Sequence, residues 1–226
     1  FTATDDDGGS DSDTATITIT DNAPVANAGS NRTGNEGSAI SFAGTFTDQG
    51  SGHTFLWNFG DGATATTQVA THTYADNATY QTTFTVTDAA GNFDTDNATA
   101  TISNVAPTAN AGANQSGNEG ASLAFSGTFT DPGAADTHSY LWNFGDGTSA
   151  TTRNAPHTYA DNGTYTATFT VTDDDGAVDS DSQIVTVSNV APTLGAISLT
   201  SGLVEGTSIG FSSSVTDPGT VDTFTY

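Results

Sequence analysis

The residues best able to take part in catalysis are two histidines, each followed four positions later by an aspartate. His72 precedes Asp76 and His157 precedes Asp161, in a chain rich in serine and threonine. A histidine oriented by a carboxylate can activate a hydroxyl nucleophile. However, the pair occurs twice at the same spacing, and no serine lies in a nucleophile-elbow sequence. An identical site in successive repeats is not typical of an enzyme, so we predict that the chain is not one.

A second candidate is the sequence Gly-Asp-Gly, which occurs at residues 60–62 and 145–147. An aspartate between glycines could belong to a calcium-binding loop, but the spacing of an EF-hand is missing. In turns, glycine supplies a positive φ and aspartate bonds to nearby backbone, so we interpret both segments as turns. Two further histidines, His53 and His138, are interpreted as exposed loop or edge residues.

The charge balance indicates that cations, not anions, are the natural counterpart of this chain. It has 26 acidic residues against two arginines, and a formal net charge of −24. Such a chain cannot neutralise phosphates, so we predict no nucleic-acid partner and no binding to anionic membrane surfaces. No stretch approaches the roughly 18 apolar residues of a membrane span, which argues against direct membrane insertion. Without cysteine, disulfides and thiolate metal sites are excluded.

The chain contains internal repeats. The sequence Leu-Trp-Asn-Phe-Gly-Asp-Gly at residues 56–62 recurs 85 residues further on, at 141–147. An Ala-Pro pair precedes each repeat, and proline marks a boundary because it is disfavoured within a central strand. We expect a segment of a longer repetitive protein. The predicted parts are residues 1–22, the last strands of a preceding domain; 23–105 and 106–190, two complete domains; and 191–226, the first strands of a following domain.

The hydrophobic pattern predicts β-strands. Residues 165–172 alternate Tyr, Ala, Phe and Val with Thr, which is typical of a sandwich strand with one buried face. Each complete repeat has one tryptophan (Trp57 and Trp142) and a tyrosine placed like a tyrosine corner (Tyr80 and Tyr165). We predict an all-β chain of tandem immunoglobulin-like antiparallel β-sandwiches with about seven strands each. Both tryptophans should be buried at equivalent positions.

These motifs together resemble the PKD (polycystic kidney disease) domain family. They are Trp-Asn-Phe-Gly-Asp-Gly, His-Thr-Tyr-Ala-Asp-Asn-Gly-Thr-Tyr and Phe-Thr-Val-Thr-Asp-Asp-Asp-Gly. The family usually has Asp after the Trp, where this chain has Asn58 and Asn143. The resemblance covers both complete repeats and both fragments. It implies a sandwich fold on extracellular or cell-surface proteins, where relatives are spacers, adhesion modules or accessory domains of secreted hydrolases, and some bind calcium.

Acidic and amide side chains are predicted to gather where one domain joins the next. In an immunoglobulin-like sandwich the start of the first strand, the loop between strands two and three, and the loop between strands six and seven share one end. Ca²⁺ prefers such oxygen ligands, although solvated turn aspartates are the alternative. Asp136 lies in one of these loops, and Asn189, Asp217 and Asp222 lie at the equivalent places of the following domain. The candidate Ca²⁺ ligands are Asp21, Asn22, Asp48 and Asp88 for residues 23–105, and Asn104, Asp131, Asp173 and Asp174 for residues 106–190.

Two functions remain open. The first is a structural segment of a long extracellular or cell-surface stalk, fibre or adhesin, which could form a filament because strand edges without lysine invite pairing. The alternative is a set of accessory substrate-binding modules in a large secreted hydrolase that acts on polysaccharide or fibrous protein. The expected partners are further copies of the same chain or surface glycans. Phe93 is one of few spare aromatic residues that could serve the second function.

Overall fold

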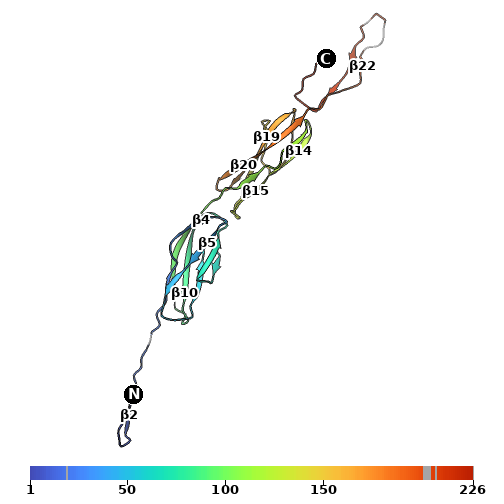
Figure 1. Cartoon of the computed structure of the whole chain (residues 1–226). Coiled ribbons are helices and arrows are strands. Elements are labelled where there is room, and N and C mark those ends of the chain that lie inside the picture. The colour runs from blue at the N-terminus through green and yellow to red at the C-terminus, as the bar shows by residue number, and fades with distance from the viewer. Residues whose placement is uncertain (19, 201–204, 207, 226) are drawn as a thin grey trace. The chain divides into compact units, whose positions relative to one another are not determined.

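The chain folds into two compact units. The computed structural model describes residues 1–18, 20–200, 205–206 and 208–225 (Figure 1). No helix among these residues is long and apolar enough to cross a membrane. The first unit comprises residues 1–34, 39–73 and 78–102, and the second comprises 35–38, 74–77 and 103–226.

The first unit is a two-layered sandwich. One layer is a five-stranded sheet in the order β4-β11-β10-β7-β8, and the other contains the pairs β3-β6 and β5-β9. Phe42 of β5 packs on Trp57 of β7 with ring centroids 5.4 Å apart, which joins the layers through the core. The strands are β1 (Thr2–Thr4), β2 (Ser10–Ser12), β3 (Val25–Asn27), β4 (Arg32–Asn35), β5 (Ala39–Ala43), β6 (Thr45–Thr47), β7 (Thr54–Asn58), β8 (Thr64–Ala65), β9 (Val69–Thr73), β10 (Ala78–Thr87) and β11 (Phe93–Ser103).

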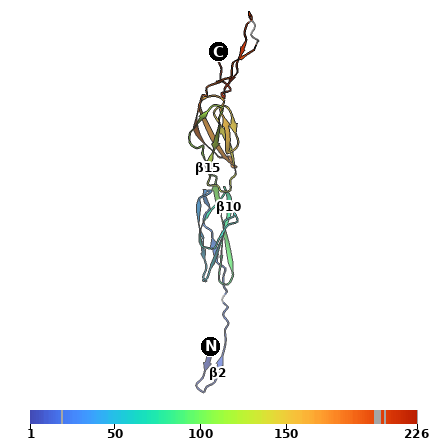
Figure 2. The ribbon, with the colours of Figure 1, turned by 90° about the vertical axis from the view of Figure 1, so that its right-hand side faces the viewer.

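The second unit repeats this arrangement. Its five-stranded sheet has the order β13-β20-β19-β16-β17, and the facing layer contains β12-β15 and β14-β18. Figure 2 shows the strands of this unit, with β15 labelled. Two short pairs, β21-β24 and β22-β23, follow. The strands are β12 (Thr108–Asn110), β13 (Gln115–Asn118), β14 (Ser122–Ser126), β15 (Thr128–Thr130), β16 (His138–Asn143), β17 (Ser149–Ala150), β18 (Asn154–Thr158), β19 (Gly163–Asp173), β20 (Val178–Ser188), β21 (Thr193–Leu194), β22 (Ser198–Leu199), β23 (Phe211–Ser212) and β24 (Val215–Thr216).

The predicted fold class, tandem immunoglobulin-like β-sandwiches, is confirmed. Each sandwich has nine strands, β3–β11 or β12–β20, against the prediction of about seven. Its five-stranded sheet has an additional strand at each edge, β4 and β8 or β13 and β17. β13 pairs parallel to β20, with Gln115 opposite Val185. Its sequence, Gln-Ser-Gly-Asn, has no apolar alternation that would have indicated a strand.

The tryptophans are the centre of each core, as predicted. Trp57 and Trp142 have exposed fractions of 0%. The indole Nε1–H of Trp142 donates to the carbonyl of Arg153 at 3.1 Å, so its polar group is satisfied inside the core. The ring packs on Phe125 and Phe169, with centroids 5.2 and 5.0 Å away. A packed aromatic cluster therefore replaces the inter-sheet disulfide of antibody domains.

The tyrosine corner is also present in the second unit. The hydroxyl of Tyr165 donates to the carbonyl of Asp161 at 2.9 Å. Two residues later, where an antibody domain has cysteine, Ala167 is completely buried. Because the alanine side chain is small, aromatic residues of the core fill the space around it.

Carboxylates attach the first strand of each sandwich. The backbone N–H groups of Ala109 and Ala111 donate to Asp179 Oδ2 and Asp181 Oδ2, both at 2.8 Å. Buried backbone donors need such partners, and here side chains of β20 supply them in place of a neighbouring strand. In the first unit the equivalent pairs are Ala26 with Asp94 and Ala28 with Asp96, at 2.8 and 2.9 Å.

Candidate functional site

Each histidine first considered for catalysis contacts the aspartate of a Gly-Asp-Gly segment and stabilises that turn. His157 Nε2 lies 2.7 Å from Asp146 Oδ2, and its ring stacks on Phe144 with centroids 4.0 Å apart. Its partner is thus the aspartate of Gly-Asp-Gly and not Asp161. Burial opposes ionisation of Asp146, but hydrogen bonds from Thr148 and the contact with His157 outweigh it and lower the pKa of Asp146. The first unit has the same arrangement of His72, Asp61 and Phe59.

The Gly-Asp-Gly segments are turns, as interpreted from sequence. Asp146 Oδ1 accepts a hydrogen bond from the backbone N–H of Thr148 at 3.0 Å. Gly145 and Gly147 have φ values of 84° and 90°, which favour glycine. The aspartate therefore closes the turn with one oxygen and holds the histidine with the other.

His53 and His138 are not exposed, so that interpretation was wrong. The side chain of His138 is 9% exposed, and its Nε2 lies 2.8 Å from Asp131 Oδ2. His53 is 11% exposed and lies 2.7 Å from Asp48 Oδ2. Phe129 packs on the ring of His138 with centroids 4.4 Å apart. Both histidines thus contact a predicted Ca²⁺ ligand.

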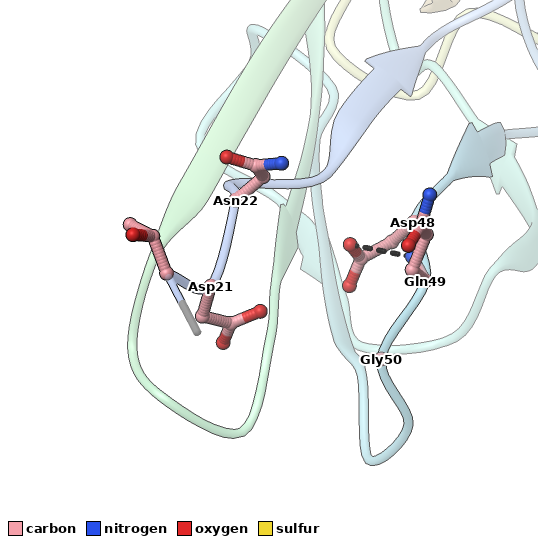
Figure 3. Close-up of a pocket in the computed structure, with 6 residues that line it drawn as sticks. Asp21, Asn22, Asp48, Gln49 and Gly50 are labelled. Carbon is pink, nitrogen blue, oxygen red and sulfur yellow. Dashed lines mark hydrogen bonds between the residues drawn. The ribbon is translucent and has the colours of Figure 1, made fainter. Parts of the chain in front are cut away.

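Three of the predicted ligands in the first unit face a surface pocket of about 380 Å³. Asp21 and Asn22 lie on one segment and Asp48 on another, around the same opening (Figure 3). Asp48 Oδ1 accepts the backbone N–H of Gln49 at 2.8 Å, and its other oxygen contacts His53. The oxygens of this aspartate therefore already have partners.

Asp88, the fourth predicted ligand, does not line this pocket. Its two oxygens accept hydrogen bonds from the backbone and side-chain amides of Asn92, at 2.9 and 3.0 Å. Burial opposes ionisation, but these hydrogen bonds outweigh it and lower the pKa of Asp88. Among the described residues, the clusters of three or more metal-binding side chains include neither Asp21, Asp48 nor Asp88.

The predicted ligands of the second unit lie closer together. Carboxylate oxygens of Asp131, Asp136 and Asp173 lie within 4.8 Å of one another. Asn104 Nδ2 donates to Asp173 Oδ2 at 2.9 Å, whereas the buried Oδ1 of Asn104 has no hydrogen-bond partner. A further group joins Asp136 with Asp174 and Asp175. The donor set is suited to a hard cation such as Ca²⁺.

Another cluster joins Asp136 to a buried glutamate that was not among the ligands predicted from the sequence. Oxygens of Glu36, Asp76 and Asp136 lie within 4.8 Å of one another, all in the second unit. Glu36 has an exposed fraction of 0%. Its Oε1 accepts the backbone N–H of Val105 at 2.6 Å, while its buried Oε2 has no hydrogen-bond partner. An unpaired buried carboxylate oxygen is costly, so it needs an explanation.

The glycine that follows this glutamate fixes its position. Gly37 has a φ of 67°, and a Cβ there would lie 2.6 Å from the carbonyl oxygen of Pro132. Its N–H donates to the carbonyl of Tyr74 at 2.9 Å, and the N–H of Glu36 donates to Ser103 at 3.1 Å. The Glu-Gly sequence is thus required for the turn that presents the glutamate.

The same arrangement occurs a second time. Oxygens of Glu119, Asp217 and Asp222 lie within 4.8 Å of one another. Glu119 is 1% exposed, its Oε1 accepts the N–H of Val190 at 2.5 Å, and its Oε2 is buried without a partner. The N–H of Gly120 donates to the carbonyl of Tyr159 at 2.9 Å, as Gly37 does to Tyr74. The repeat therefore reproduces both the cluster and the backbone that holds it.

These carboxylates repel one another. Two unit charges 4 Å apart cost about 1 kcal/mol in water and about 4 kcal/mol near a protein surface. Burial, together with the carboxylates of Glu36 and Asp131, raises the pKa of Asp136 to about 6. Burial is also the main cause that raises the pKa of Glu36 and of Asp222. The clusters therefore favour a proton or a cation.

A different surface, the outer face of each five-stranded sheet, is free of charge. In β16, β19 and β20, which the structure describes completely, every side chain on this face is a hydroxyl, an amide or an aliphatic group. The hydroxyls of Thr168 and Ser182 lie 3.0 Å apart, and Leu141 and Ile184 are 43% and 39% exposed. The acidic side chains of β20, by contrast, bond to Ala109 of β12 and to Ala111, the residue after this strand. The face consists of Ser139, Leu141, Asn143, Thr164, Thr166, Thr168, Thr170, Thr172, Val178, Ser180, Ser182, Ile184, Thr186 and Ser188.

The first unit has an equivalent uncharged face on β7, β10 and β11. The hydroxyls of Thr85 and Thr95 lie 2.8 Å apart there. Leu56 is 43% exposed, and Phe93 is 66% exposed. In a chain with a net charge of −24, another molecule can dock on two such faces without burying unpaired carboxylates.

The sandwiches, the repeated cores and the structural role of the histidines define a tandem immunoglobulin-like β protein. Residues 21–103 and 104–188 each match the PKD domain, and the chain belongs to this family. The resemblance found in the sequence is thus confirmed. PKD domains are a non-catalytic type of module, which also confirms that the chain itself is not an enzyme.

Two curated bacterial proteins are similar to parts of the chain. Collagenase ColA of Bacillus cereus is 51% identical over 49 residues, which are 22% of this chain and 5% of that protein. The microbial collagenase of Vibrio alginolyticus is 38% identical over 88 residues, which are 38% of this chain and 11% of that protein. The similarity thus covers only a small part of either relative.

Solved structures with similarity include two sets of bacterial modules. The PKD1 domain of the Vibrio cholerae metalloprotease PrtV is 34% identical, with a TM-score of 0.32, and the match covers 37% of this chain and 98% of that one. The fibronectin(III)-like modules of Clostridium thermocellum CbhA are 19% identical, with a TM-score of 0.32, covering 74% of this chain and 93% of theirs.

Proposed function

We propose that this chain is part of the accessory, non-catalytic region of a secreted collagenase-like hydrolase, where its sandwiches bind the fibrous protein substrate. Similarity to two bacterial collagenases supports the class of enzyme. The observation that carries the binding role is the uncharged outer face of each five-stranded sheet. This proposal corresponds to the alternative function predicted from the sequence and places the chain outside the cell.

The outer faces fit such a role for electrostatic reasons. A polymer that docks on a carboxylate-rich surface must leave charges unpaired or desolvated, which costs free energy. On the outer face of β16, β19 and β20 the hydroxyls of Thr168 and Ser182 offer hydrogen bonds, and Leu141 and Ile184 offer apolar contact. The acidic residues elsewhere keep the modules soluble.

Cosedimentation with insoluble collagen fibres tests the proposal, with cellulose and chitin as polysaccharide comparisons. The 226-residue chain should bind collagen, and Thr85→Asp with Thr168→Asp should weaken binding at least tenfold, because each places a charge at the centre of a face. Ser122→Asp is the matched control, since this exposed residue lies on β14 in the opposite layer.

Two results would contradict the proposal. One is a double variant that binds as well as Ser122→Asp. The other is a chain that binds no collagen under any condition. The second result would leave the structural stalk or fibre as the better function, and self-association measured by light scattering would then support that reading.

A further inference from the structure

Two buried glutamates have an oxygen that nothing in the described structure satisfies. Glu36 and Glu119 are 0% and 1% exposed, and each uses only Oε1, which accepts a backbone N–H. The Oε2 atoms are buried and have no hydrogen-bond partner. A buried carboxylate oxygen that faces other carboxylates is stable only if a proton or a cation lies between them.

We propose that Glu36, Asp76 and Asp136 bind one Ca²⁺ ion, and that Glu119, Asp217 and Asp222 bind a second. In each cluster the ligand oxygens already lie within 4.8 Å of one another. Ca²⁺ binds oxygens at 2.3–2.6 Å, so two oxygens on opposite sides of the ion are about 5 Å apart. The ion therefore fits without a large rearrangement of either cluster.

The choice of Ca²⁺ follows from the donor atoms and their surroundings. Each cluster supplies three hard carboxylates and no nitrogen or sulfur ligand, which excludes a typical zinc site. Mg²⁺ requires near-octahedral geometry at 2.0–2.1 Å and retains several waters. A site closed on one side by a fully buried glutamate is less suited to that hydration than to Ca²⁺.

Asp136, Asp217 and Asp222 of these clusters lie in the loops predicted to meet at the junctions, but the two glutamates were not predicted as ligands. Asp131 and Asp173 use their oxygens for Gly133, His138, Asn104 and Ala177. The Oε2 atoms of the two glutamates accept no such hydrogen bonds. In addition, the repeat preserves the whole arrangement, including the hydrogen bonds from Val105 and Val190 that orient the glutamates. The inference does not depend on the proposed collagen-binding function.

Calorimetric titration with CaCl₂ after removal of divalent ions with EDTA tests the proposal. We expect two sites in the 226-residue chain that depend on the two glutamates. Glu36→Gln should lower Ca²⁺ affinity at one site at least tenfold, and the double variant with Glu119→Gln should do so at both. Glutamine keeps the acceptor for Val105, so the variant should fold.

Glu205→Gln is the matched control. It changes the third Glu-Gly copy by the same charge, at a residue that is exposed. Its titration should be the same as that of the wild-type chain. Melting curves in EDTA and in CaCl₂ give a second readout, because a ligand that binds only the folded state raises its stability.

Three results would overturn the proposal. The first is a wild-type chain that shows neither binding heat nor a melting shift with CaCl₂. The second is equal Ca²⁺ binding by Glu36→Gln, Glu119→Gln and Glu205→Gln. The third is a loss of all binding in Asp131→Asn while the glutamate variants bind normally, which would place the ion with Asp131 and Asp173 instead.

Discussion

At the scale of single residues, the surroundings of each carboxylate determine whether it closes a turn or is available to a cation. Asp88 and Asp173 have their oxygens occupied by nearby amides. Glu36 has one oxygen occupied and one without a partner. Sequence alone shows the type of residue but not the number of donors that folding brings to it.

This difference explains which part of the site could be predicted. Loop topology led to Asn104, Asp131 and Asp173, because turn residues at one end of a sandwich are close together in any such fold. The role of Glu36 was missed, since it depends on a turn packed in the second unit. A usable signal existed, however. The chain has only three glutamates, and each precedes a glycine at an equivalent place in a repeat.

The raised pKa of Asp136 predicts an unusual pH dependence without calcium. Its pKa is about 6 in the folded chain against 3.8 for a free side chain. The folded state therefore holds a proton more tightly, and this contribution to stability is lost as the pH rises from about 4 through 6. Asp136→Asn cannot ionise, so it should not lose stability as the pH rises. At pH 7 its free energy of unfolding should exceed that of the wild type by an amount on the order of 1–3 kcal/mol.

Urea denaturation followed by tryptophan fluorescence in EDTA at pH 5, 6 and 7 measures this effect. Asp6→Asn, at an exposed residue outside the clusters, is the control for net charge. If Asp136→Asn and Asp6→Asn change stability equally at all three pH values, repulsion around Asp136 is not significant.

At the scale of strands, the pattern of apolar residues was sufficient to predict the sandwich but not to predict its edge strands. Long strands such as β19 alternate between a buried face and a hydroxyl face, so their orientation can be read directly. β13 has no such alternation and is held by parallel pairing to β20. β12 is three residues long, and the N–H groups of its Ala109 and of Ala111, the residue after it, bond to carboxylates of β20. Contacts of this kind depend on tertiary structure and leave no local pattern.

The carboxylates that attach β12 predict a specific loss of stability. Asp181→Ala leaves the N–H of Ala111, a residue only 2% exposed, without its partner. A buried donor left unsatisfied costs about 1–3 kcal/mol. Ser180→Ala, on the outer face of the same strand, should change stability by less than about 0.5 kcal/mol. Equal denaturation midpoints for the two variants would show that water replaces the carboxylate.

A glycine between β14 and β15 predicts a packing effect. A Cβ at Gly127 would lie 2.4 Å from the ring of Phe169, which is completely buried. Gly127→Ala must therefore displace the core and should cost about 1–3 kcal/mol. At Gly163, whose nearest atom would be 3.4 Å from a new Cβ, alanine should be tolerated. Thermal melting of both variants compares them, and equal melting temperatures would mean that the aromatic core adjusts freely.

At the scale of the whole molecule, the net charge of −24 sets how stability responds to salt. Like charges spread over the chain repel one another, and screening shortens their range from about 30 Å at 0.01 M salt to about 10 Å at 0.1 M. With only two arginines, few attractive pairs are weakened in return. Stability should therefore rise with salt, in contrast to a protein held together by surface ion pairs.

Thermal melting in EDTA with added NaCl or choline chloride tests this expectation. Screening does not depend on the identity of a monovalent cation, so both salts should raise the melting temperature equally. A relief of about 1 kcal/mol corresponds to roughly 4–8 °C for a domain of this size. CaCl₂ at matched ionic strength, without EDTA, should raise it further, because occupation of the glutamate clusters adds to screening. If NaCl stabilises and choline chloride does not, sodium binds at particular sites and general repulsion is not the main effect. If CaCl₂ adds nothing beyond screening, the carboxylate clusters contribute only to the net charge.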